Sequence, residues 1–133
     1  MRRLLLLLPL VFLLGCTTTP SATPIAISCQ PYGYTPAPIA FSFAPGPVTS
    51  SAAEQTAVAL FRSCELPGTT FTDLTSSSKA TTGMRGGPND GQAVWLVEVD
   101  ATVTEPMPNA TYYSHFLFEV NQATGIPTVV GNG

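Results

Sequence analysis

Apolar and polar positions alternate strictly in two segments of this chain, residues 93–104 and residues 111–121. Successive side chains of a β-strand point to opposite faces, so this period predicts two strands, each with one buried face and one partly wet face. The face that we expect to be buried carries Trp95, Val97, Val99, Ala101 and Val103 in the first strand and Tyr112, Ser114, Phe116, Phe118 and Val120 in the second.

A helical period occurs between residues 51 and 64. Apolar side chains recur there at one-turn spacing, which places them on one face of a helix. They are Ala53, Ala57, Leu60, Phe61 and Cys64. We expect the helix to begin with a capping box, in which Ser51 and Glu54 each satisfy a backbone amide of the other. Pro67-Gly68 follows the segment and ends it.

Shorter segments complete the predicted secondary structure. Residues 25–29 and 39–43 alternate briefly and predict two short strands, and residues 126–130 predict a closing strand. Residues 70–74 are a further candidate strand. The glycine-rich residues 83–91 predict a turn rather than a phosphate-binding loop, because no Gly-Lys-Ser/Thr sequence ends them.

These elements together predict an α+β fold. Consecutive strands joined by short turns pair with one another, which gives an antiparallel meander sheet of three to five strands. One α-helix (about residues 51–64) packs on this sheet as a second layer. We expect residues 25–133 to form a single small α+β domain.

The start of the chain has the layout of a secretory signal peptide. Arg2 and Arg3 precede the apolar residues 4–14, a run that is too short to span a bilayer as a helix. The sequence Leu13-Leu14-Gly15-Cys16 then resembles the lipobox of bacterial lipoproteins. The resemblance implies removal of residues 1–15 and attachment of a diacylglycerol to the sulfur of Cys16.

A lipid on Cys16 would anchor the mature chain to a membrane outside the cytoplasm. Thr17 occupies a position where an aspartate favours the inner membrane, so the sequence favours the outer membrane in an organism that has two. Residues 16–24 contain no large apolar side chain and predict a flexible tether. The alternative is an ordinary signal peptide that leaves Cys16 as a free thiol.

Cys29 and Cys64 remain once Cys16 is assigned to the lipid. An even pair of cysteines in an oxidising compartment predicts a disulfide. This bond would tie the first short strand to the C-terminal end of the helix. Two separate buried thiols are the alternative.

Charge argues against a nucleic-acid partner. Removal of residues 1–15 takes away Arg2 and Arg3 and changes the formal net charge from −3 to −5. The remaining basic residues are Arg62, Lys79 and Arg85. They are scattered along the chain, so the sequence predicts no basic surface for nucleic acid.

Candidate catalytic chemistry is sparse. His115 is the only histidine, and neither a nucleophile elbow nor a set of metal ligands accompanies it, so we expect no catalytic residue, metal or cofactor. Glu98 and Asp100 share one strand face, and Glu119 belongs to the neighbouring strand. A solvated sheet face is the plain interpretation, and a carboxylate-dependent hydrolase or a calcium site is a remote alternative.

Four tyrosines are candidates to line a surface for a protein partner or a carbohydrate, because tyrosine is enriched in binding hot spots: Tyr32, Tyr34, Tyr112 and Tyr113. The residues that we assign to this surface are Tyr32, Tyr34, Tyr113 and His115. The tyrosines would serve equally to pack a loop and the edge of the sheet.

The order of elements over residues 51–130 resembles that of PepSY-type domains. Ala93–Val99 corresponds to the family's aliphatic strand and carries Trp95. Residues 121–125 correspond to its Asp-x-x-Thr-Gly motif, with Asn121 in place of the aspartate. The resemblance implies a binding module that regulates or inhibits, without catalytic residues.

We therefore predict a non-catalytic, lipid-anchored interaction module of the bacterial envelope, with a protein partner there. A structural or assembly accessory lipoprotein of an envelope complex is the alternative, and the hydrolase is a remote one.

Overall fold

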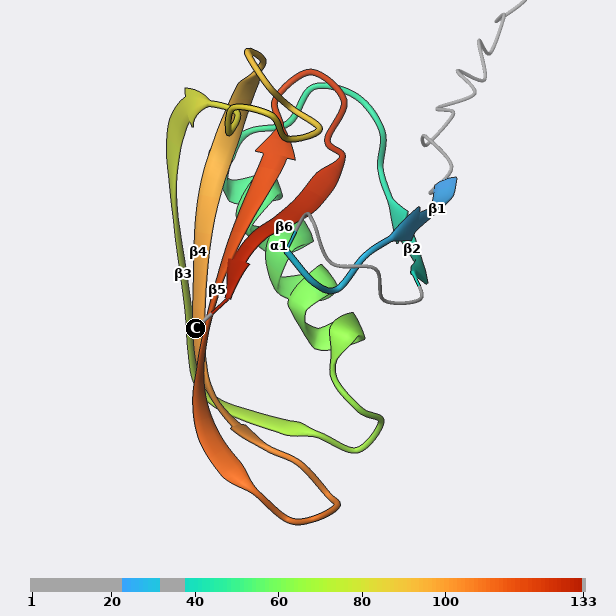
Figure 1. Cartoon of the computed structure of the whole chain (residues 1–133), viewed down its shortest axis with the longest axis vertical. Helices are drawn as coiled ribbons and strands as arrows, with labels where there is room; N and C mark the ends of the chain where they lie inside the picture. The colour runs from blue at the N-terminus through green and yellow to red at the C-terminus, as the bar shows by residue number, and fades with distance from the viewer. Residues whose placement is uncertain (1–22, 32–37, 133) are drawn as a thin grey trace, which may run out of the picture.

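The computed structural model describes residues 23–31 and 38–132 of the 133-residue chain (Figure 1). Its elements in order are β1 (Thr23–Ile27), β2 (Ile39–Phe43), α1 (Ser50–Cys64), β3 (Thr70–Thr82), β4 (Ala93–Thr104), β5 (Thr111–Asn121) and β6 (Pro127–Asn132). Four strands form one antiparallel sheet in the order β3-β4-β5-β6, and β1 pairs with β2 in a separate ribbon. The predicted α+β fold with a meander sheet is confirmed.

Strands β4 and β5 have the predicted bounds, and their register places the predicted faces together. Val97 lies opposite Phe118 and Val99 opposite Phe116. Opposed residues of an antiparallel pair project to the same face, so these side chains form one apolar surface. We call it the inner face of the sheet, and the opposite surface the outer face.

Helix α1 packs on the inner face through the stripe that the sequence predicts. The buried side chains of α1 are Ala53, Ala57, Leu60 and Phe61. The Phe61 ring meets the rings of Phe71 and Phe116 edge to face, each at a centroid distance of 5.4 Å. This geometry is favourable for aromatic pairs.

The predicted capping box of α1 is wrong. The N-cap is Thr49, whose Oγ1 accepts a hydrogen bond from the backbone N–H of Ala52 at 3.2 Å. Ser51 lies inside the first turn, and Glu54 reaches across to β3 instead. The Glu54 carboxylate accepts hydrogen bonds from the hydroxyls of Ser76 at 3.3 Å and Ser78 at 2.6 Å.

Strand β3 is longer than the candidate strand at residues 70–74, since it continues to Thr82. A register shift between Thr72 and Thr75 interrupts its pairing with β4, and Asp73 there has a φ of 53°. Beyond this bulge the strand consists mainly of serine and threonine. This part of β3 contacts α1 through hydrogen bonds to Glu54 and not through apolar side chains. The sequence therefore lacks the apolar alternation that would have predicted a strand here.

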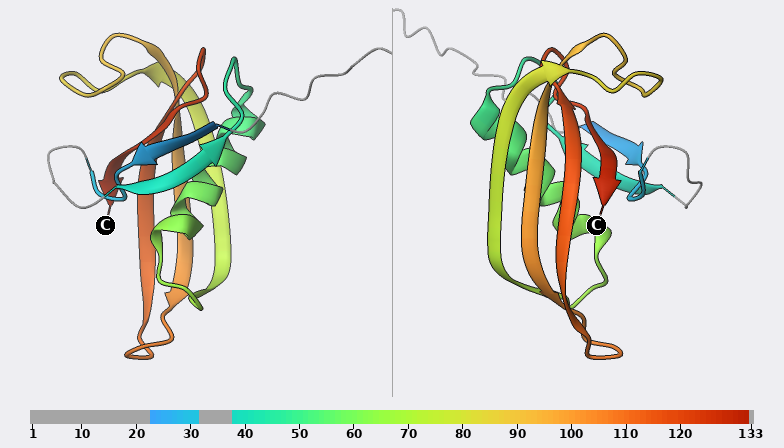
Figure 2. Two further views of the ribbon diagram at one scale, coloured as in Figure 1. Left: turned by 90° about the vertical axis from the view of Figure 1, so that its right-hand side faces the viewer. Right: turned by 60° about the vertical axis from the view of Figure 1, so that its left-hand side comes forward.

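The β1–β2 ribbon packs on the inner face beside α1. Figure 2 shows α1 over the half of the sheet near β3 and β4, and the ribbon over the half near β6. Ile27, Phe41 and Phe43 of the ribbon are buried in the common core. Strand β1 begins at Thr23, so residues 23 and 24 belong to the ribbon and not to the predicted tether.

Covalent and polar contacts hold the ribbon and its following loop in place. A disulfide joins Cys29 to Cys64 with a Cα–Cα distance of 5.5 Å. A closed loop of this length contributes about 4 kcal/mol in the chain-entropy model. The indole N–H of Trp95 donates to the carbonyl oxygen of Val48 at 3.0 Å. The sheet is thereby tied to the loop that leads from β2 into α1.

Within residues 23–31 and 38–132, no helix has both the length and the apolar character needed to cross a membrane.

Exchange of the cap residue tests the observed start of α1. Thr49→Ala should lower the free energy of unfolding by about 1 kcal/mol, because it leaves the Ala52 amide without its acceptor. Ser51→Ala is the matched control and should change it by less than about 0.5 kcal/mol. Denaturant unfolding measures both. A larger loss for Ser51→Ala than for Thr49→Ala would contradict the assignment.

Candidate functional site

The outer face of the sheet is not covered by α1 or by the ribbon. In the right-hand view of Figure 2 the four strands stand in front, with α1 and the ribbon behind them. The side chains of this face alternate with those of the core along β4 and β5. Three polar residues near the middle of β4 and β5 form the candidate site: Asp100, Tyr113 and His115.

Strand register brings these three residues together. Asp100 lies directly opposite His115, and Tyr113 is two positions along the same strand as His115. One oxygen of Asp100, Oδ1, accepts a hydrogen bond from the Tyr113 hydroxyl at 2.5 Å. The same oxygen lies 2.6 Å from Nδ1 of His115. The alternation predicted that Tyr113 and His115 share a face, and the pairing adds Asp100 to them.

The two hydrogen bonds favour the ionised form of Asp100. The bond from Tyr113, and next the bond from His115, lower the pKa of the Asp100 carboxyl below its usual value. The bond to Asp100 in turn raises the pKa of the Tyr113 hydroxyl. A carboxylate only accepts hydrogen bonds, so Nδ1 of His115 carries a proton and donates it. Among the described residues none hydrogen bonds to Nε2, which can therefore bond to another molecule.

The cluster is accessible to a large partner. Tyr113 is 66% exposed, and the side chains of His115 and Asp100 are 36% and 28% exposed. An Asp–His pair of this kind orients the imidazole in hydrolases, where a hydroxyl or thiol must also bond to the histidine. Among the described residues no such nucleophile hydrogen bonds to His115. The arrangement presents a phenol ring and an imidazole in fixed positions.

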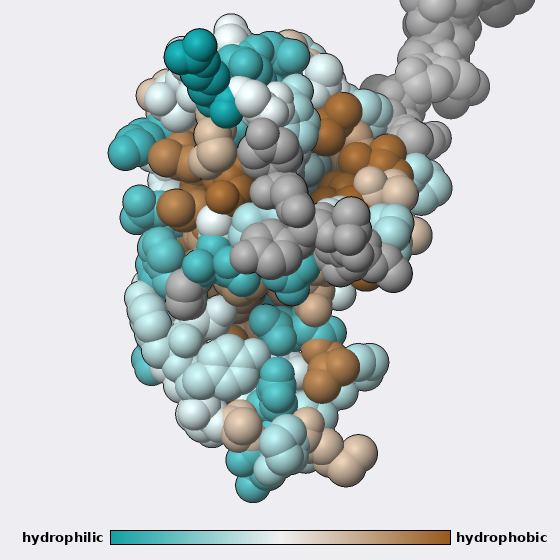
Figure 3. Space-filling view, in the orientation of Figure 1, coloured by the Kyte–Doolittle hydropathy of each residue, from teal (hydrophilic) through white to brown (hydrophobic). Residues whose placement is uncertain are grey.

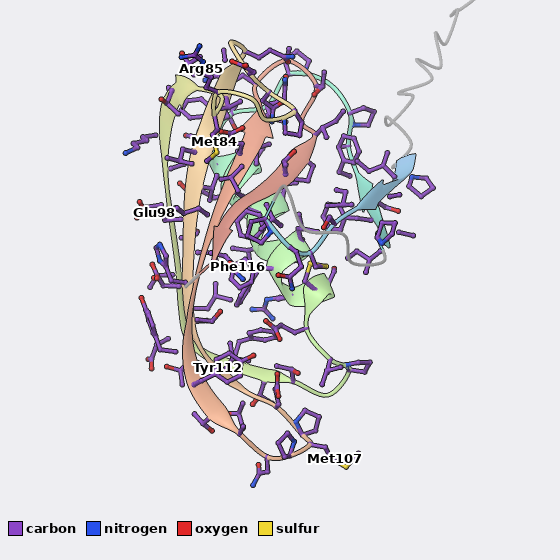
Figure 4. The ribbon with its side chains drawn as sticks, in the orientation of Figure 1. Met84, Arg85, Glu98, Met107, Tyr112 and Phe116 are labelled. Carbon is purple, nitrogen blue, oxygen red and sulfur yellow. A yellow bond between two sulfur atoms is a disulfide. The ribbon has the colours of Figure 1, made fainter. Side chains whose placement is uncertain are left out.

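The three carboxylates of the remote hydrolase hypothesis are not brought into one cleft. Glu98 lies opposite Leu117, two positions from Asp100 along β4, and projects away from α1 (Figure 4). Glu119 is only 2% exposed. The expectation that Glu119 lies on a solvated face is therefore wrong.

The loop between β3 and β4 buries Glu119. Its carboxylate accepts hydrogen bonds from the backbone N–H of Met84 at 2.5 Å and from the side-chain amide of Asn89 at 3.3 Å. The amide of Asn121 donates to the side-chain oxygens of Asn89 and Gln92. The predicted turn is thus folded back over the end of the outer face. Alternation alone gives no signal for this cover.

An open cleft lies on the inner side, where the C-terminal end of α1 meets β5 and the disulfide. It has a volume of about 470 Å³, and its lining includes Glu65, Tyr112, Ser114 and Phe116. The Tyr112 hydroxyl donates to Glu105 at 3.0 Å and lies 3.4 Å from a carboxylate oxygen of Glu65. Figure 4 shows Tyr112 directed toward the α1 side of the sheet.

Burial and nearby charge raise the pKa values of Tyr112 and Glu65 in this cleft. Burial, together with hydrogen bonds and charge from Glu105 and Glu65, raises the pKa of Tyr112 to about 12. Burial raises the pKa of Glu65, and the nearby Glu105 adds to this effect, while the hydrogen bond from Tyr112 opposes it. The contact joins residues far apart in the sequence, so no local pattern predicts it.

Three predicted site residues, Cys16, Tyr32 and Tyr34, lie outside the described residues. Within the described parts of the chain, no three His, Cys, Asp or Glu side chains gather as ligands for a metal ion.

Comparison with known proteins gives no relative. No protein-family model, curated protein or solved structure matches this chain significantly.

The raised pKa of Glu65 predicts a pH-dependent effect of Glu65→Gln. A raised pKa means that folding favours the protonated form of Glu65. The stability gained in this way is fully present below the ordinary pKa of 4.5 and is lost as the pH rises through the higher pKa of the folded protein. The glutamine side chain of the variant cannot ionise. The melting temperature of the variant should exceed that of the wild type at pH 7, and the difference should vanish at acidic pH.

Thermal unfolding followed by circular dichroism at several pH values measures this difference. Glu98→Gln on the outer face is the control and should show no such gain. A lower melting temperature for Glu65→Gln at pH 7 would contradict the burial penalty that we assign to Glu65.

Proposed function

We propose that this chain is a lipid-anchored, extracytoplasmic interaction module of the bacterial envelope, and that its outer sheet face binds a protein partner. The observation that carries the proposal is the exposed Tyr113 ring, whose hydroxyl is bonded to Asp100 beside His115. No catalytic role is assigned to the cluster.

The fixed orientation of Tyr113 favours a binding role. An exposed side chain normally loses rotamer freedom when a partner covers it, and this loss opposes association. The hydrogen bond to Asp100 restrains the Tyr113 ring before any partner arrives. Tyrosine supplies a large apolar surface with a polar tip, which suits the centre of an interface. His115 adds a nitrogen that can accept or donate a hydrogen bond.

The anchor rests on the N-terminal sequence. The basic residues, the apolar run and Leu13-Leu14-Gly15-Cys16 support lipidation of Cys16 and placement outside the cytoplasm. The disulfide between Cys29 and Cys64 is compatible with an oxidising compartment. The choice of the outer membrane stays a prediction from Thr17.

A regulatory or inhibitory role of the PepSY type also stays a prediction. It is supported by the order of α1, β4, β5 and β6 over residues 51–130. Asn121, at the position of the family's aspartate, accepts hydrogen bonds from the backbone N–H groups of Ala123 and Thr124. An aspartate carboxylate would accept the same two bonds.

Partner capture from intact envelopes tests the proposal. Envelopes that contain the affinity-tagged full chain are chemically crosslinked, and the bound proteins are identified by mass spectrometry. Tyr113→Ala should reduce recovery of a specific partner about tenfold or more, as truncation of a hot-spot tyrosine does. Met107→Ala is the matched control, because Met107 is 80% exposed in the β4–β5 turn.

The control should recover the partner as the wild type does, and both variants should keep the wild-type circular dichroism spectrum. If Tyr113→Ala leaves recovery of the partner unchanged, the partner does not bind through Tyr113 on the outer face. The absence of any specific partner in the wild-type sample would reject the binding role.

A further inference from the structure

The charges of this chain are distributed unevenly along the sequence. Residues 4–53 contain no aspartate, glutamate, lysine, arginine or histidine. All eight acidic residues lie from Glu54 onward. The ribbon and the loop that leads into α1 belong to the uncharged part. The remainder of the domain, which includes the outer face, carries the acidic charge.

The uncharged ribbon presents small side chains to solvent. Pro24 lies opposite Ser42 and Ala26 opposite Ala40, and all four are exposed. Because the partners of an antiparallel pair share a face, these residues form the side of the ribbon that is turned away from the core. A surface without charges can approach an apolar medium without the cost of removing ions from water.

An apolar groove lies beside the ribbon, between β1 and β6. It has a volume of about 250 Å³, and its lining includes Ile25, Ile27, Ile126, Pro127 and Val129. Ile126 is 39% exposed. In Figure 3, hydrophobic side chains gather over this side of the molecule, close to where the described chain begins.

The length of chain before the ribbon limits where the ribbon can lie. Six residues separate Cys16 from Thr23, and even a fully extended chain spans at most about 25 Å between these two residues. A lipid on Cys16 would therefore hold the ribbon close to the bilayer. The outer face lies on the other side of the molecule, beyond the sheet (Figures 1 and 2).

We propose that the domain rests against the lipid bilayer that holds its anchor. The surface in contact with the bilayer is the β1–β2 ribbon together with the apolar groove between β1 and β6 that includes Ile126. This inference rests on the proposed lipidation of Cys16 and adds an orientation to it. Anionic lipid headgroups repel the acidic remainder of the domain, so the uncharged side is the one that can approach them. The outer face is then directed away from the membrane, toward partners.

The isoleucines provide a direct test, because the chain has four and all lie in the ribbon or its groove: Ile25, Ile27, Ile39 and Ile126. The full chain is produced in a bacterial host, labelled with ¹³C at Ile and Leu methyl groups, and placed in nanodiscs containing a lipid with a paramagnetic headgroup. NMR should show loss of the Ile126 and Ile25 methyl signals. Leu96 and Leu117 on the outer face should keep theirs.

Charge variants give matched controls for this experiment. Ala40→Glu puts an acidic group on the exposed side of the ribbon and should restore the isoleucine signals. Ser77→Glu puts the same group on β3, at an exposed position of the outer face, and should leave the loss unchanged.

Two outcomes separate this inference from the proposed function. Mass spectrometry and flotation of the nanodiscs report whether Cys16 carries a lipid, and its absence would overturn both proposals. Lipidated protein in which Leu96 and Leu117 lose signal as strongly as Ile126 would overturn only the orientation. Loss of isoleucine signals in the absence of lipid, increasing with protein concentration, would assign the ribbon to a second copy of the chain instead.

Discussion

The packing of α1 on the inner face is the interaction on which the rest of the structure depends. Leu60 and Phe61 are fully buried, and the Phe61 ring lies against rings from both β3 and β5. A four-stranded antiparallel sheet of this kind commonly has one face on the core and one in contact with water. The position of α1 decides which face of the sheet is buried, and the ribbon packs on the same side.

This sidedness connects the fold to both functional proposals. Because α1 and the ribbon occupy one side, the middle of the outer face stays open, and polar groups such as Asp100 and Tyr113 can hydrogen bond there without being buried. The disulfide between Cys29 and Cys64 fixes the ribbon to the end of α1. The segment nearest the proposed lipid is thereby held on the side opposite the proposed partner surface.

The sequence predicted the parts of the fold in which apolar periodicity is strong. Strands β4 and β5 and the buried stripe of α1 follow from it directly. The cap of α1 was missed because Thr49 and Ser51 are both suitable cap residues, and local sequence does not choose between them. The second half of β3 was missed because serines bonded to Glu54 replace an apolar face. Burial of Glu119 depends on a distant loop that folds back, and contacts of that range leave no local pattern.

Neighbouring truncations in β4 test the sidedness most directly. Val97 is fully buried on the inner face, whereas Leu96 is partly exposed on the outer face. Val97→Ala should lower the free energy of unfolding by about 2 kcal/mol, although valine is the smaller side chain. Leu96→Ala should lower it by less than about 1 kcal/mol. Denaturant unfolding of the two variants compares them, and a loss for Leu96→Ala equal to or larger than that for Val97→Ala would contradict a sheet with one covered face.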